Sequence, residues 1–166
     1  MLKKGLISIS ISAALLLLSG CSSSSTMVLQ PKVVQQSLYT SYNVEEVVIA
    51  NNVPEDARKY FKTYLQKTLT DKQQVQGSDL KIQYSFIEFN EGNQFSRWML
   101  GGIGGAGKGV LTVKTEFYNK DNNKIGEIQS KGELGAGFFG GSFNGTLEKV
   151  AEEVSEYAVM NYLAKK

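Results

Sequence analysis

Two residue types that dominate enzyme chemistry are nearly missing from this 166-residue sequence: it contains no histidine, and Cys21 is its only cysteine. Without histidine, neither a Ser-His-Asp triad nor a Cys-His nucleophile can be built. Zinc sites made of cysteine and histidine are excluded for the same reason. No convincing pair of carboxylates takes their place. We therefore expect a non-enzymatic protein without catalytic residues, a bound metal or a cofactor.

The sequence also lacks a strong excess of charge of either sign. Its formal net charge is +2, from 18 basic and 16 acidic residues. The two surplus charges, Lys3 and Lys4, lie in the first 20 residues, so the rest of the chain is formally neutral. Proteins that bind nucleic acids carry a basic field. Its absence here argues against a nucleic-acid partner.

Long hydrophobic runs are scarce as well. The apolar run Leu6–Leu18 is too short to span a bilayer, which takes about 20 apolar residues. Serines interrupt this run, and no later stretch is long and apolar enough to span. A basic start, a short apolar run and small residues beside the cleavage site are typical of a secretory signal peptide. We therefore expect residues 1–20 to be a signal peptide.

The stretch Leu18-Ser19-Gly20-Cys21 resembles the lipobox of bacterial lipoproteins. The resemblance implies that Cys21 is lipidated, becomes the mature N-terminus and anchors the protein to a membrane, because two or more acyl chains give a stable anchor. Ser22 follows the cysteine, which is similar to lipoproteins sorted to the outer membrane of Gram-negative bacteria. The expected location is the cell envelope, on the outer membrane and facing the periplasm.

After the cysteine, the chain divides into a short tether and one domain. The serine run Ser22–Ser25 predicts a flexible tether. The mixed segment Thr26–Asn43 is either irregular or an edge strand. Residues 21–43 are therefore expected to be the lipidated N-terminus and tether. Residues 44–166 suffice for a single domain with a modest core.

Hydrophobic periodicity predicts six elements in that domain. In chain order they are a strand at Val44–Ala50, a helix from Pro54 to Asp71, strands at Leu80–Phe86, Leu111–Phe117 and Ile125–Leu134, and a helix at Thr146–Leu163. The order β-α-β-β-β-α predicts an α+β fold. This fold is a two-layer sandwich, in which the helices cover one face of a mostly antiparallel sheet.

Eleven of the 17 glycines lie in two short stretches, residues 101–109 and 135–145. The first stretch contains the pattern G-x-G-x-x-G followed by Lys108, but Gly109 stands where a phosphate loop has serine or threonine. An alternating strand also follows where nucleotide binding needs a helix, so we expect no nucleotide partner. The strands next to these stretches are predicted to be antiparallel. Both glycine-rich loops should therefore emerge at the same end of the sheet.

Large apolar side chains accompany the two loops, and we take them as candidate interaction residues. They are Trp98, Met99, Ile103, Phe138, Phe139 and Phe143. Two interpretations stay open. The side chains fold back and cap the core, or they form an exposed contact surface.

From Arg97 to Tyr162 the sequence resembles a family of small bacterial lipoproteins that is catalogued only as a domain of unknown function. The likeness rests on Arg97 before the loop GGIGGAGKG, the strand segment KIGEI, the loop GAGFFGGSF and a closing helix. It implies a location in the cell envelope and no catalytic residues. A more distant likeness, in element order alone, is to periplasmic α/β domains of lipoproteins that activate cell-wall synthases or assemble secretion pores.

These observations favour a membrane-anchored, non-enzymatic lipoprotein that binds an envelope protein or associates with itself through the two glycine-rich loops. The alternative is a module that binds a small ligand or a glycan, with the aromatic loops as its platform. Stoichiometric protein partners would favour the first function, and a specific soluble ligand would favour the second.

Overall fold

The computed structural model of the protein describes five segments of the chain. They are residues 23–32, 38–47, 53–90, 109–133 and 143–164. Among these residues, no helix has the length and apolar character that crossing a membrane requires.

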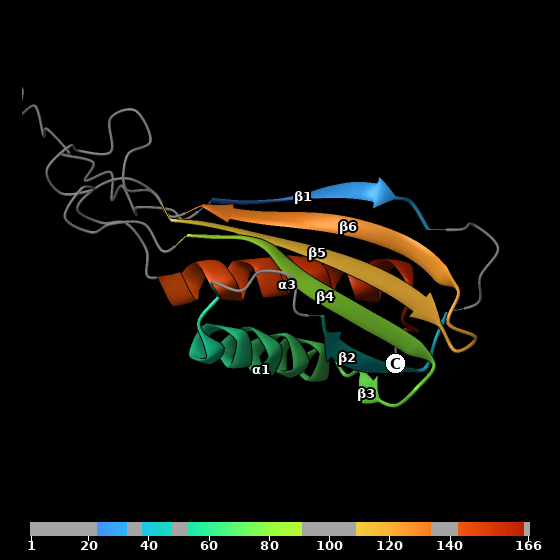
Figure 1. The fold of residues 1–166 in the computed structure, drawn as a ribbon. Coiled ribbons are helices and arrows are strands. Elements are labelled where there is room, and N and C mark those ends of the chain that lie inside the picture. The colour runs from blue at the N-terminus through green and yellow to red at the C-terminus, as the bar shows by residue number, and fades with distance from the viewer. Residues whose placement is uncertain (1–22, 33–37, 48–52, 91–108, 134–142, 165–166) are drawn as a thin grey trace, which may run out of the picture.

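A six-stranded sheet with the order β1-β6-β5-β4-β2-β3 forms one layer. Its strands are β1 (Ser23–Gln30), β2 (Ser41–Glu46), β3 (Val75–Gln76), β4 (Leu80–Asn90), β5 (Val110–Asn119) and β6 (Lys124–Glu133). Along the sheet, β1 is antiparallel to β6, β6 to β5, and β5 to β4. Strand β2 is parallel to both of its neighbours, β4 and β3. The helices α1 (Glu55–Asp71) and α3 (Phe143–Asn161) lie side by side on one face of the sheet (Figure 1). The predicted α+β sandwich with a mostly antiparallel sheet is thus confirmed.

Helix α1 forms because its sequence combines an acidic first turn with one apolar stripe. Glu55 and Asp56 occupy the first turn, where negative charge complements the helix dipole. The buried side chains recur every four residues: Ala57, Phe61, Leu65 and Leu69. Tyr60 and Tyr64, predicted for the same stripe, are partly buried and pack against the core.

Helix α3 buries a second apolar stripe against the sheet. Its buried apolar residues are Leu147, Val150, Ala151, Val154 and Ala158. Hydroxyl groups of α1 join the two helices directly. Tyr60 donates a hydrogen bond to Glu148, and Tyr64 donates one to Glu152 Oε1 at 2.9 Å.

Two glycines of β6 let α3 and the residues after it approach the sheet closely. A methyl group on Gly126 would lie 1.9 Å from the hydroxyl oxygen of Tyr162, and one on Gly132 would lie 2.5 Å from Cγ2 of Thr146. Tyr162 is fully buried, and its hydroxyl donates a hydrogen bond to the carbonyl of Ile125 at 3.3 Å. The glycines therefore set the distance between the two layers.

The opposite face of the sheet is polar, and several of its charges are paired. Lys124 lies 2.7 Å from Glu127 and 3.4 Å from Glu116, and Lys131 lies 2.7 Å from Glu133. Antiparallel sheets commonly keep one such solvated face. A polar outer face is expected for a sheet whose helices cover only the opposite face.

The expected flexible tether is wrong for Ser23–Ser25, because these residues begin strand β1. Almost the whole of β1 is paired with β6, and Thr26 Oγ1 lies 2.7 Å from Ser130 Oγ. One side of an edge strand faces solvent. Such a strand can therefore be held by backbone hydrogen bonds to its neighbour, without the alternating apolar pattern of a buried strand. The edge-strand interpretation of the following segment is correct through Gln30. The sheet therefore begins well before residue 44, the expected start of the domain.

Other predicted boundaries shift by a few residues. Strand β2 begins at Ser41 and ends at Glu46, whereas residues 48–50 of the expected strand lie outside the described residues. Helix α3 begins at Phe143 and ends at Asn161. The two-residue strand β3 was not predicted.

Candidate functional site

Four strand ends lie in one row at one end of the sheet. The register pairs Ser23 with Glu133, Glu133 with Val110, and Val110 with Asn90. We call these four residues the strand-end row. Because Val110 follows the first glycine-rich stretch and Glu133 precedes the second, the prediction that both loops emerge at one end is confirmed for their attachment points. The N-terminal segment enters β1 at the same row, which was not foreseen.

Most of the predicted interaction residues lie outside the described part of the chain. Trp98, Met99, Ile103, Phe138 and Phe139 belong to this group, as does the predicted lipidation site at Cys21. Their contact role therefore stays a prediction.

Phe143 is the predicted interaction residue that the structure describes. Its ring centroid lies 5.0 Å from that of Phe89 in an edge-to-face contact, and Phe89 contacts Phe86 at 6.5 Å. Phe143 is partly buried and packs against the core. At this position the side chain helps to close the core beside the strand-end row.

The outer edge of β1 is a second candidate interaction surface, and the sequence had not indicated it. In the described structure β1 is the last strand on its side of the sheet and pairs only with β6. Its eight residues include no charge and no proline. Met27, Val28 and Leu29 expose 62%, 48% and 46% of their surface.

Natural sheets usually protect such edges with charged residues, proline, bulges or very short strands. The opposite edge follows this rule, since β3 has only two residues. The β1 edge has one such irregularity, a register shift between Val28 and Gln30, but it has neither a charge nor a proline. With eight residues against two in β3, it is the edge better suited to pair with another chain. The apolar run Met27–Leu29, which follows the serines and Thr26, was the available sequence signal. It is too short to show which side of the strand is open.

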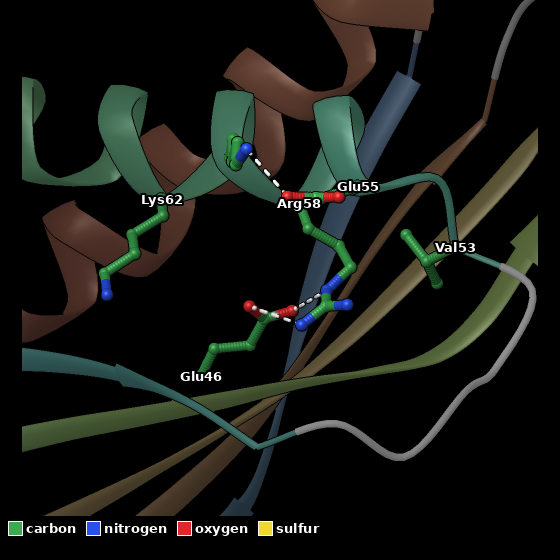
Figure 2. Close-up of a pocket in the computed structure, with 6 residues that line it drawn as sticks. Glu46, Val53, Glu55, Arg58 and Lys62 are labelled. Carbon is green, nitrogen blue, oxygen red and sulfur yellow. Dashed lines mark hydrogen bonds and ion pairs between the residues drawn. The ribbon is translucent and has the colours of Figure 1, made fainter.

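An open pocket of about 380 Å³ lies between the end of β2 and the start of α1. Figure 2 shows Arg58 directed at Glu46. Arg58 Nε donates to Glu46 Oε1 at 2.6 Å, and Nη2 donates to Oε2 at 3.1 Å. This hydrogen-bonded pair raises the pKa of Arg58 above its ordinary value. The charges of Arg58 and Glu46 are thus already paired with each other.

The other charged groups of this pocket lie toward solvent. Lys59 pairs with Glu55 at 2.7 Å, and both side chains are three-quarters exposed. Lys62 lies apart from the Glu46–Arg58 pair (Figure 2). Among the described residues, no group of three or more cysteine, histidine, aspartate or glutamate residues could hold a metal ion. The pocket is thus lined by two carboxylates and three cationic groups, of which Lys62 lies apart from the pairs (Figure 2).

A family model described as a domain of unknown function, DUF4410, matches residues 46–137, more than half of the chain. The chain belongs to this family. The matched region runs from the end of β2 to the segment that follows β6, so it contains most of the sheet and helix α1. A comparison with curated protein sequences gave no match.

A solved structure shares the fold at low sequence identity. The PelC dodecamer from Paraburkholderia phytofirmans is 10% identical, with a TM-score of 0.50, and the alignment covers 87% of this chain and 99% of PelC. A single-substitution variant of PelC from the same organism, also a dodecamer, is 16% identical with a TM-score of 0.48. That alignment covers 79% of this chain and 98% of the variant. At 10% identity, the first of these likenesses concerns the fold alone.

Proposed function

We propose that this DUF4410 chain is a lipid-anchored, non-enzymatic protein of the bacterial cell envelope that acts as an assembly module. It contacts an envelope protein or further copies of itself. The lipobox-like stretch that ends at Cys21 supports the anchor, and Ser22 supports the outer membrane facing the periplasm. The absence of histidine supports a role without catalysis.

The open edge of β1 carries this proposal. A second chain can add a strand there, because main-chain hydrogen bonds provide affinity and the exposed side chains provide specificity. Met27, Val28 and Leu29 are more than one-third exposed along this strand, so a partner strand would cover apolar surface as well as backbone groups.

Copies of the same chain are the partner that we favour. The PelC dodecamer shows that a protein of this fold assembles with copies of itself. Anchoring to a membrane would also confine the copies to one surface and raise their effective concentration. An unrelated envelope protein remains the other partner class in the experiment below.

The two glycine-rich loops form the second part of the proposed contact surface. Trp98, Met99 and Ile103 belong to the first loop, and Phe138 and Phe139 belong to the second. Aromatic residues are common anchors at protein contacts. Phe143, the remaining predicted interaction residue, packs against the core.

A matched pair of methionines tests the assembly proposal. Met27 on β1 and Met160 on α3 expose 62% and 72% of their surface, and each is replaced by lysine. A lysine on the edge strand should oppose strand addition, whereas Met160→Lys places the same charge on a helix. We expect chemical cross-linking in membranes to give a complex for the wild type and for Met160→Lys, and to give none for Met27→Lys.

Circular dichroism first establishes that both variants fold. If folded Met27→Lys cross-links as strongly as the wild type, the β1 edge is not the contact. Mass spectrometry of the cross-linked band then identifies the partner. Peptides of this chain alone would support self-association, and a second protein at equal amounts would support the other partner class.

The second candidate function is a module for a small ligand or a glycan. The open pocket beside Arg58 and Lys62 is the observation that favours it. Isothermal calorimetry with envelope glycans and with small anions tests this candidate. Specific binding by a chain that forms no complex, lost in Lys62→Ala, would support it over assembly.

A further inference from the structure

We infer that the strand-end row faces the membrane and that the sheet stands upright on it, with the β5–β6 turn as the distal tip. This inference rests on the proposed lipid anchor at Cys21. It adds an orientation and a lipid-facing end to the proposed function. The row consists of Ser23, Glu133, Val110 and Asn90, which are paired in sequence across four strands.

The covalent chain fixes how far the row can lie from the anchor. Ser23 follows Cys21 by two residues, which span at most about 7 Å even when fully extended. Ser23 itself is already paired with Glu133. The slack that a tether would provide is therefore absent, and the lipid must lie beside the first residue of the sheet.

The dimensions of the sheet place its two ends, the strand-end row and the β5–β6 turn, at different distances from the anchor. Neighbouring strands lie about 4.8 Å apart, so the other members of the row remain within about 14 Å of Ser23 across the sheet. Strand β5 has ten residues and spans about 30 Å. The turn between β5 and β6 is therefore much farther from the anchor than the row is.

The sequences at the two ends agree with this orientation. The 18 residues that join Asn90 to Gly109 include three charges, and the nine that join Glu133 to Phe143 include none. The first segment contains Trp98, and tryptophan is enriched at the membrane–water interface. The second contains the apolar pair Phe138 and Phe139. The distal turn Asn119–Lys124 consists of asparagine, aspartate and lysine residues. The row end is thus the end that fits beside a lipid surface, and the glycine-rich segments attached to it would contact neighbouring copies at the level of the membrane.

Flat orientations fit the surface less well. The sheet face away from the helices has paired charges, such as Lys124 with Glu127. The exposed face of α1 is charged too, with Lys59 bonded to Glu55 and Lys67 to Asp71. An upright sheet also leaves the β1 edge free for the lateral contacts proposed above.

Site-directed fluorescence quenching tests the orientation on the full, lipidated chain. Cys21 is the only cysteine and is blocked once acylated, so a thiol-reactive fluorophore attaches only to an introduced cysteine. Asn90→Cys reports on the row, Asp121→Cys on the distal turn, and Gln30→Cys on the distal end of β1. The proteins are reconstituted in phosphatidylethanolamine–phosphatidylglycerol vesicles that contain a lipid with a nitroxide headgroup.

We expect strong quenching of the label at position 90 and background quenching at positions 121 and 30. Equal quenching at positions 90 and 121, or stronger quenching at 121, would overturn the orientation. Stronger quenching at position 30 than at position 90 would show that the molecule lies on its β1 edge, which also overturns it. Glu88→Cys and Lys120→Cys form a second pair for the two ends, should a first variant fail to fold.

Lipidation is measured separately, so that the two claims can fail separately. Incorporation of a labelled fatty acid at Cys21, and sedimentation with membranes, test the anchor. A chain that is not acylated overturns the anchor and the orientation together. An acylated chain with the wrong quenching pattern overturns the orientation alone.

Discussion

The closest approach between the two layers gives a quantitative prediction for Gly126→Ala. The new methyl group would lie 1.9 Å from the hydroxyl oxygen of Tyr162 and 3.1 Å from its Cζ atom. The ring cannot simply move away, because it is fully buried and its centroid lies 4.6 Å from that of Phe117. The substitution must therefore displace a packed aromatic ring.

Three effects set the size of the loss. Forcing a core side chain aside costs about 1–3 kcal/mol. Losing the hydrogen bond from Tyr162 to Ile125 costs ~1 kcal/mol. Alanine regains about 0.5–1 kcal/mol relative to glycine through the entropy of the unfolded chain. The free energy of unfolding should therefore fall by about 2 kcal/mol overall, measured by urea denaturation followed by circular dichroism.

A double variant shows whether the hydroxyl group is the cause. Tyr162→Phe removes the atom closest to the new methyl group, so Gly126→Ala should cost less in the Tyr162→Phe background than in the wild type. Contacting residues are expected to show such coupling. If Gly126→Ala leaves stability unchanged, or if the two effects simply add, the close approach of Tyr162 to β6 is wrong.

Three further predictions concern the anchor, the helix faces and pH. Cys21→Ser should leave a precursor that is uncleaved or mislocalised; quantitative sedimentation of this variant with membranes would contradict the lipid anchor. Phe61→Asp and Val154→Asp should each unfold the domain, because an unpaired buried charge costs several kcal/mol; thermal melts like those of the wild type would show that the helix faces are misassigned. The hydrogen bond to Glu152 raises the pKa of Tyr64 to about 12, above its ordinary value of 10.0. Since the folded state then holds this proton more tightly than the unfolded chain, the stabilisation is complete below about pH 10 and is lost as the pH rises through about 12. Tyr64→Phe should reduce this loss in urea titrations between pH 8 and 12, and identical pH profiles for the two proteins would exclude the contribution.

The helices and the three long central strands were predictable from the sequence because each buries one face. Phe61 and Leu65 in α1, and Val150 and Val154 in α3, repeat at the helical period and are buried. Prediction of β4 stopped at Phe86 because the register shifts between Phe86 and Glu88. A bulge breaks the two-residue period there, although the strand continues to Asn90.

Strand β1 and the strand-end row were less accessible to sequence reasoning. The serines of β1 favour irregular structure locally, and their pairing with β6 joins residues that are more than 100 positions apart. The local preference of a residue for strand or loop does not indicate which distant strand it pairs with. The common end of the two glycine-rich loops was predictable, because it depends only on the antiparallel order of β5 and β6. The nearness of Ser23 to those loops was not, because it depends on the long-range β1–β6 pairing.

The central claim is that this chain acts as an assembly subunit on a membrane. The most direct measurement is the mass of the lipidated, full-length protein after extraction in a mild detergent, determined by analytical ultracentrifugation over a range of concentrations. Our account predicts a complex of several copies, or of this chain with a second protein, that Met27→Lys dissociates and Met160→Lys does not. A single folded chain at every concentration, for the wild type as for both variants, would contradict it.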